Sequence, residues 1–147
     1  MTSNEFNDWD DSIAQFFTLK NLLNDAKRLQ LLTFAADELQ SILTEETQRG
    51  VFVNGQNKQY SAGYAKERAK RGRQTSFVDM TFTGGTVQRS MTKSEDVPTM
   101  SFVLKLNSRA SKLTTFNKKR YDWFAVNAIR QAKLYESTQN YLNKLSK

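Results

Sequence analysis

The chain has 147 residues, the size of one domain with a modest core, and it contains neither cysteine nor histidine. This composition excludes a disulfide framework, a cysteine nucleophile and a zinc finger, and it removes the commonest general base near neutral pH. We therefore expect a protein that is not an enzyme and that needs no metal or other cofactor. No apolar run approaches the ~20 residues of a membrane span, and the acidic N-terminus is unlike a signal peptide, so a soluble intracellular protein is expected.

The charge is divided unevenly along the chain. The formal net charge is +7, but residues 1–50 carry nine acidic and four basic side chains, a net charge of −5, whereas residues 51–147 sum to +12. Such asymmetry favours head-to-tail association between copies, or contact with an anionic partner. The alternative is that the two signs pair with each other inside one fold.

The first third of the chain predicts a long helix. From about Asp11 to Arg49 apolar residues recur at helical spacing, and no glycine or proline occurs before Gly50. Asp10 or Asp11 is expected to cap its start, and Gly50 is a typical stop signal. An uninterrupted helix would be about 55–60 Å long at ~1.5 Å per residue, so we expect a break near Asn21–Asn24.

A protruding basic segment is predicted after this helix. Asn54 and Gly55 indicate a turn with short extended flanks, and residues 60–75 are polar, with five basic side chains against Glu67 alone. We interpret residues 50–76 as an extended arm or loop between the first helix and the sheet, within a single domain that spans 1–147. The arm is expected to become ordered only against a neighbour.

A small antiparallel sheet is predicted next. Residues 77–83 alternate between apolar and polar side chains, as in a half-buried strand, and a double glycine ends the run. Residues 94–98 read as a loop, and residues 100–106 predict a second strand that pairs with the first.

Two further helices are predicted to close the chain. Ser108 is expected to cap a short helix, and Asn127 to cap the last one, whose apolar stripe includes Ile129 and Leu142. The predicted fold class is therefore α+β: a long N-terminal helix, an extended basic arm, a small antiparallel sheet and a C-terminal helix.

The arm carries the candidate contact residues: Lys66, Arg68, Lys70, Arg71 and Arg73. Basic side chains flanked by aromatic ones, as here, can grip phosphates without reading sequence. The same charges can instead meet an acidic protein surface, including the acidic half of a neighbouring copy, or simply keep a solvated loop soluble. All three interpretations stay open at this point.

A pair of large apolar residues stands in the polar connector before the last helix. Trp123 and Phe124 are expected to pin that helix to the core, with an interface anchor as the alternative.

Three segments of the sequence, taken together, resemble those of a known family. They read RGVFVNGQNKQYSAGYAKERAKRGR from Arg49, VDMTFTGGTVQRS from Val78 and RYDWFAVN from Arg120. Their order is similar to that in the neck and tail-completion proteins of tailed bacteriophages, the virion-morphogenesis family of head–tail joining proteins. The resemblance assigns structural motif positions to seven residues: Asp79, Thr83, Gly84 and Ser90 at the end of a strand, and Arg120, Trp123 and Phe124 before the last helix.

The resemblance implies a non-enzymatic component of the virion, located at the head–tail junction and in the host cytoplasm during assembly. Such a protein forms a homo-oligomeric ring, commonly six- or twelve-fold, and joins the portal side to the tail. Its partners would be adjoining portal, connector or tail proteins, with non-specific contact to packaged DNA and none to a membrane. From the residues alone, the alternative is a small basic nucleic-acid-binding protein.

Overall fold

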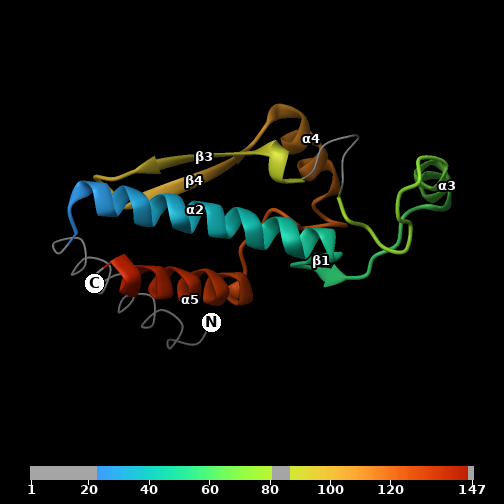
Figure 1. Cartoon of the computed structure of the whole chain (residues 1–147). Helices are drawn as coiled ribbons and strands as arrows, with labels where there is room; N and C mark the ends of the chain where they lie inside the picture. Colours follow the sequence, from blue (N-terminus) through green and yellow to red (C-terminus); the bar gives the residue numbers. More distant parts are fainter. Residues whose placement is uncertain (1–22, 81–86, 146–147) are drawn as a thin grey trace.

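The computed structural model describes residues 23–80 and 87–145, which form an α+β fold. Its helices are α2 (Asp25–Gln48), α3 (Ala62–Lys70), α4 (Ser108–Asn117) and α5 (Ala128–Leu145), with a 3₁₀ turn η1 (Val87–Ser90). Its two antiparallel sheets are the hairpins β1 (Val51–Phe52) with β2 (Gly55–Gln56), and β3 (Met91–Asp96) with β4 (Ser101–Leu106). Helix α2 runs between the β3–β4 hairpin and α5, and α3 stands away from these layers at one end (Figure 1). The predicted fold class is confirmed.

Helix α2 is the central element of the body, and its two ends follow local rules. The Asn24 side-chain oxygen accepts a hydrogen bond of 2.9 Å from the backbone N–H of Lys27, which caps the first turn. This start agrees with the break expected near Asn21–Asn24; the expected caps Asp10 and Asp11 lie outside the described residues. Gly50 follows the last turn with a φ of +73°, a left-handed conformation that suits glycine.

The core surrounds α2 on both sides. One cluster joins it to the strands and the connector: Leu39, Leu43, Phe52, Val78, Met80, Met91 and Trp123. A second, of Leu23, Leu31 and Leu142, joins it to the end of α5, where the rings of Phe34 and Tyr141 stack 4.1 Å apart. A two-stranded hairpin is marginal on its own in water. The β3–β4 hairpin is therefore stabilised mostly by the burial of its inner face on α2.

The larger hairpin corrects the predicted sheet. Strand β4 lies where a strand was expected, but its partner is β3, in the register Met91 opposite Leu106 through Asp96 opposite Ser101. Residues 77–80 form no strand, and the rest of that predicted strand lies outside the described residues. The pattern missed β3 because only Met91 of its six residues is buried. A tight turn at 97–100, rather than an apolar period, brings it against β4.

Asparagine caps both closing helices. The Asn107 side-chain oxygen accepts from the backbone N–H of Ala110 at 2.9 Å, so Asn107, and not Ser108, caps α4. Asn127 caps α5 as predicted, accepting from the Arg130 backbone N–H at 3.0 Å.

The connector residue Trp123 pins this end of the molecule to the core, as predicted. Its side chain is fully buried, and its Nε1–H donates to the Thr114 hydroxyl of α4 at 3.0 Å. Phe124 packs against the same cluster. The expected apolar stripe of α5 is correct at Leu142 and wrong at Ile129, which is 65% exposed.

A buried ion pair joins α2 to α5. The Arg130 side chain is 1% exposed, and its Nε donates to a Glu46 carboxylate oxygen at 2.7 Å. Its two terminal nitrogens donate to the carbonyl oxygens of Trp123, at 2.9 Å, and Val51, at 3.4 Å. One guanidinium thus links both helices, the connector and the first strand, and such a fork of donors is specific to arginine.

The Glu46 carboxylate makes the stability of this junction depend on pH. Burial alone raises the pKa of Glu46, but hydrogen bonds from Lys133 and Arg130, together with their charges, outweigh it and hold the pKa below the usual 4.5. A group whose pKa is depressed by folding stabilises the protein above its unfolded pKa and loses that effect as the pH falls through the folded value.

We predict that Glu46→Gln lowers the free energy of unfolding near neutral pH, and that the difference from the wild type shrinks steadily below pH 4.5. Urea denaturation across a pH series measures both. Glu67→Gln is the matched control, because Glu67 is 55% exposed in its pair with Lys70. A gap between wild type and Glu46→Gln that stays constant down to acidic pH would contradict the assignment.

Candidate interface on the protruding helix

Residues 58–76, here called the protrusion, leave the body after β2, form α3 and return. The sequence predicted an arm over residues 50–76, but its first part forms the β1–β2 hairpin, with Phe52 in the core, and the helix within the remainder was not predicted. Its nine residues, AGYAKERAK, are mostly good helix formers, and Arg68 and Lys70 in the last turn suit the negative end of the helix dipole. A helix this short is marginal in water on its own. It therefore needs an anchor.

That anchor is a buried ion pair between Arg68 and Asp79. An Arg68 Nη atom donates to an Asp79 oxygen at 2.9 Å, and the two side chains are 3% and 10% exposed. Arg68 Nε also donates to the Gln74 carbonyl at 2.9 Å, and the guanidinium carbon lies 4.5 Å from the centre of the Tyr60 ring. The contact holds α3 to the segment that re-enters the core at Val78.

The Asp79 carboxylate has further partners. The Tyr60 hydroxyl donates to it at 2.7 Å and the Gln74 side-chain amide at 2.8 Å, while the backbone N–H of Asp79 donates back to the Tyr60 oxygen at 3.0 Å. Burial raises the pKa of Tyr60 well above its usual 10.0. The hydrogen bond from the Asp79 backbone N–H opposes this rise, whereas the hydrogen bond to the Asp79 carboxylate and its negative charge add to it. The tyrosine thus stays a proton donor, and a buried charge pair with this many hydrogen bonds is well compensated.

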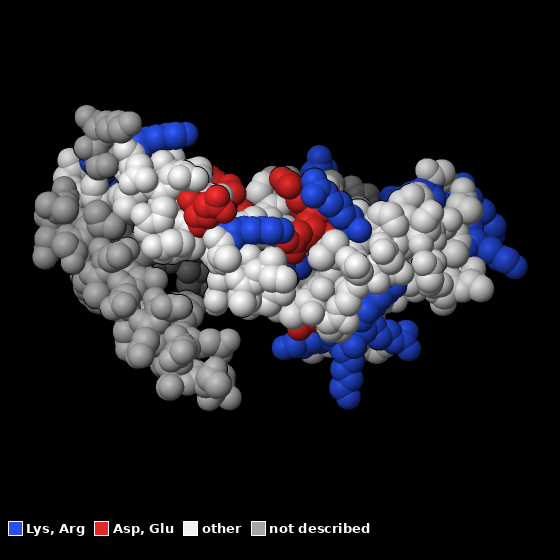
Figure 2. Space-filling model, turned by 90° about the horizontal axis from the view of Figure 1, so that it is seen from below, with Lys and Arg blue, Asp and Glu red and all other residues white. Residues whose placement is uncertain are grey.

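The predicted contact residues fall into two groups. Lys66, Lys70 and Arg71 are exposed and Arg73 is half-buried, so these four can face a partner. Arg68 cannot face a partner, because its guanidinium is buried in the ion pair with Asp79. Its assignment as a contact residue is therefore wrong. Figure 2 shows the lysine and arginine side chains at the end of the molecule that α3 occupies.

The seven residues assigned by the family resemblance are mostly structural where the structure describes them. Asp79, Ser90 and Trp123 are buried, and the rings of Trp123 and Phe124 lie 5.3 Å apart in contact with the core. The Ser90 carbonyl accepts from the Asn107 backbone N–H at 2.8 Å, where η1 meets α4. Thr83 and Gly84 lie outside the described residues.

Among the five of these residues that the structure describes, Arg120 is the exposed one. Its backbone carbonyl accepts a hydrogen bond from Lys58 Nζ, and the neighbouring Lys119 carbonyl accepts from the Asn54 side chain at 3.2 Å. These contacts bring the basic run Lys118, Lys119 and Arg120, all exposed, to the base of the protrusion. The sequence offered no periodicity that would have placed them there, since 60 or more residues separate the partners.

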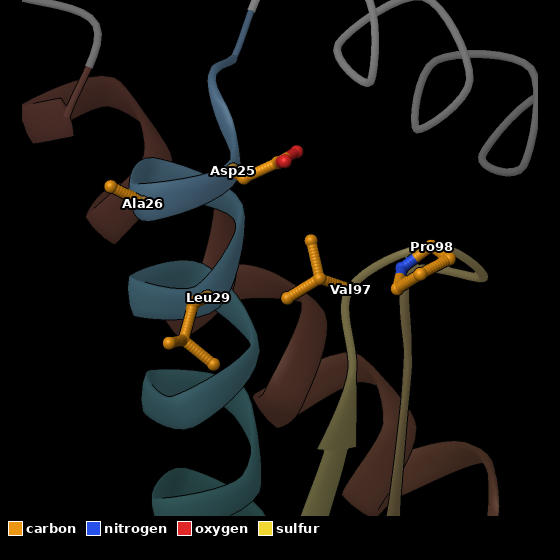
Figure 3. Close-up of a pocket in the computed structure, with 5 residues that line it drawn as sticks. All are labelled: Asp25, Ala26, Leu29, Val97 and Pro98. Carbon is orange, nitrogen blue, oxygen red and sulfur yellow. The ribbon is translucent and has the colours of Figure 1, made fainter.

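A pocket of about 560 Å³ lies at the opposite end of the body, between the first turns of α2 and the turn that joins β3 to β4 (Figure 3). It is lined by Asp25, Ala26, Leu29, Val97 and Pro98. Asp25 is its single charged side chain, so this lining offers no acid–base pair.

Among residues 23–80 and 87–145 no group of three acidic, histidine or cysteine side chains is placed to hold a metal ion. Within the same ranges none of the helices has the length and apolar character needed to cross a bilayer.

Comparisons with protein-family models, curated proteins and solved structures return no match to the chain.

The anchor of α3 is tested by a double-mutant cycle. Arg68→Met leaves the Asp79 carboxylate buried without its cationic partner, and we predict a loss of about 3–5 kcal/mol in the free energy of unfolding. Adding Asp79→Asn removes the orphaned charge, keeps an oxygen that can accept from the Tyr60 hydroxyl, and should restore most of that loss. Lys70→Met is the control: it removes only the exposed pair with Glu67 and should change stability by less than about 1 kcal/mol. Additive losses in the Arg68 and Asp79 variants would contradict a coupled buried pair.

Proposed function

We propose that the chain is a structural subunit of a phage head–tail connector, a neck or tail-completion ring protein that joins the portal side of the capsid to the tail. The observation that carries the proposal is the protrusion. A small body holds a basic helix outside itself by a buried ion pair, and the outer cations of that helix contribute nothing to the core. Their use is contact with another macromolecule.

The motif residues support this proposal through their positions. Asp79 anchors the protrusion and Trp123 fills the core beside it, so the residues that resemble the connector family are those that shape the subunit. A motif that sets the shape of a subunit, rather than an active site, is what an assembly protein requires.

Exposed apolar side chains also fit an assembly role. Phe116 of α4 is 86% exposed and Ile129 of α5 is 65% exposed. Single exposed apolar residues are ordinary on a monomer, but large ones are favoured where a protein meets a partner. In a ring, each subunit would offer one surface to the subunit before it and a different surface to the subunit after it.

Deletion of the gene from the phage that encodes it tests the proposal. We predict that lysates of the deletion strain contain DNA-filled heads and separate tails, because the joining ring is missing. Complementation with the wild-type gene should restore joined particles, counted by electron microscopy and plaque assay. Joined, infectious particles in the deletion strain would contradict the proposal.

Nucleic-acid binding is the second candidate, and the exposed Lys66, Lys70 and Arg71 favour it. It differs in its salt dependence. If these three cations neutralise phosphates, the logarithm of the affinity for random duplex should fall with the logarithm of salt with a slope of about −3, and each neutralisation should reduce that slope by about 1.

For a connector subunit we predict no measurable binding to random duplex at moderate salt. Fluorescence anisotropy with labelled duplex, for the wild type, Arg71→Gln and the off-site control Lys112→Gln, separates the two functions. Tight binding that weakens in Arg71→Gln but not in Lys112→Gln would favour the nucleic-acid alternative.

A further inference from the structure

Most of the basic side chains on the outside of α3 and just after its last turn lack a partner of opposite charge within the described part of the subunit. Lys66, Arg71 and Arg73 form no ion pair among residues 23–80 and 87–145, and Lys70 pairs only with the exposed Glu67, at 2.8 Å. The anchoring pair of Arg68 turns one side of the helix inward, so these cations project from a fixed support. A positively charged surface of this kind is preformed for an acidic partner.

An acidic groove lies on the body, between α2 and α5. It has a volume of about 250 Å³ and is lined by Glu38, Ile42, Glu45, Glu46, Arg49, Lys133, Glu136 and Ser137. Figure 2 shows acidic side chains gathered in the middle of this face, with basic ones beside them.

Two of the four carboxylates in the groove are already paired. Glu46 binds Arg130 and Lys133, and Glu45 lies 4.0 Å from Arg49.

The other two carboxylates have no cationic partner among the described residues. Glu38 accepts a hydrogen bond of 2.8 Å from the Ser137 hydroxyl, and neither Glu38 nor Glu136 forms an ion pair with any described residue. The groove therefore keeps a net negative charge, and α3 of the same subunit stands well away from α5 (Figure 1).

We infer that the outer face of α3 docks into the α2–α5 groove of a second copy of this chain. This inference rests on the proposed ring assembly and names the contact that builds it. The basic surface and the acidic groove are two different parts of one subunit, so the contact is heterologous and repeats from copy to copy until the ring closes. Lys66 on α3 and Arg71 at its C-cap supply the positive charge, and Glu38 and Glu136 supply the negative charge of the groove. Each exposed pair contributes only about 0.2–1 kcal/mol, so the association should weaken with salt.

Reciprocal charge reversal tests the contact. The basic variant is Lys66→Glu with Arg71→Glu, and the acidic-groove variant is Glu38→Lys with Glu136→Lys. Sedimentation velocity at low salt measures the assembly of each. We expect wild-type assemblies, at least a roughly tenfold weaker self-association in each variant alone, and restored assembly when the two variants are mixed in equal amounts. Restoration in the mixture also shows that both variants are folded.

Lys112→Glu with Lys144→Glu is the matched control. It reverses two exposed charges away from α3 and should leave the assemblies unchanged. Intact assemblies in both reversed variants, or a mixture that stays dissociated, would overturn the contact while leaving ring assembly in place. A wild-type chain that stays monomeric at every salt concentration and protein concentration would overturn the contact and the ring assembly together.

Discussion

A buried ion pair between Arg68 and Asp79 determines where the basic helix stands. Two charges removed from water stabilise a structure only when their geometry and hydrogen bonds are complete, and here Tyr60 and Gln74 complete them. A nine-residue helix would not persist alone. Because Asp79 lies between two core residues, Val78 and Met80, the pair connects an exposed helix directly to the packed interior. The position of every outer cation on α3 follows from that connection.

A second buried ion pair lies in the body, and it explains part of the charge asymmetry. Arg130 belongs to the basic part of the chain and Glu46 to the acidic part, and their pair joins α5 to α2. Lys93 of β3 likewise pairs with Asp37 of α2. Some of the opposite charges of residues 1–50 and 51–147 therefore do cancel inside one fold. Among the described cations outside these pairs, Lys66, Arg71 and Arg73 lie on or just after α3, and Lys118, Lys119 and Arg120 lie at its base. In the proposed assembly these side chains face a partner.

The sequence predicted the elements whose signals are local. The end of α2 follows from Gly50, the first hairpin from its Asn-Gly turn, and the α5 cap from Asn127, whereas the start of α2 was predicted only as a break near Asn21–Asn24. It did not predict β3, whose residues lack an apolar period, or α3, whose polar residues suggested a segment without order.

The part of the candidate site that depends on long-range pairing was also missed. The sequence groups Arg68 with its exposed neighbours because a buried arginine and a solvated one look alike in a sequence. The available signal is Asp79, a single carboxylate between two apolar residues, which needs a partner if it is buried.

The most direct measurement is amide hydrogen exchange of the isolated, monomeric protein. If the buried pair preforms the helix, the backbone amides of the last turn of α3 exchange far more slowly than those of an unstructured peptide. Exchange there at the unstructured rate, while α2 stays protected, would contradict the account.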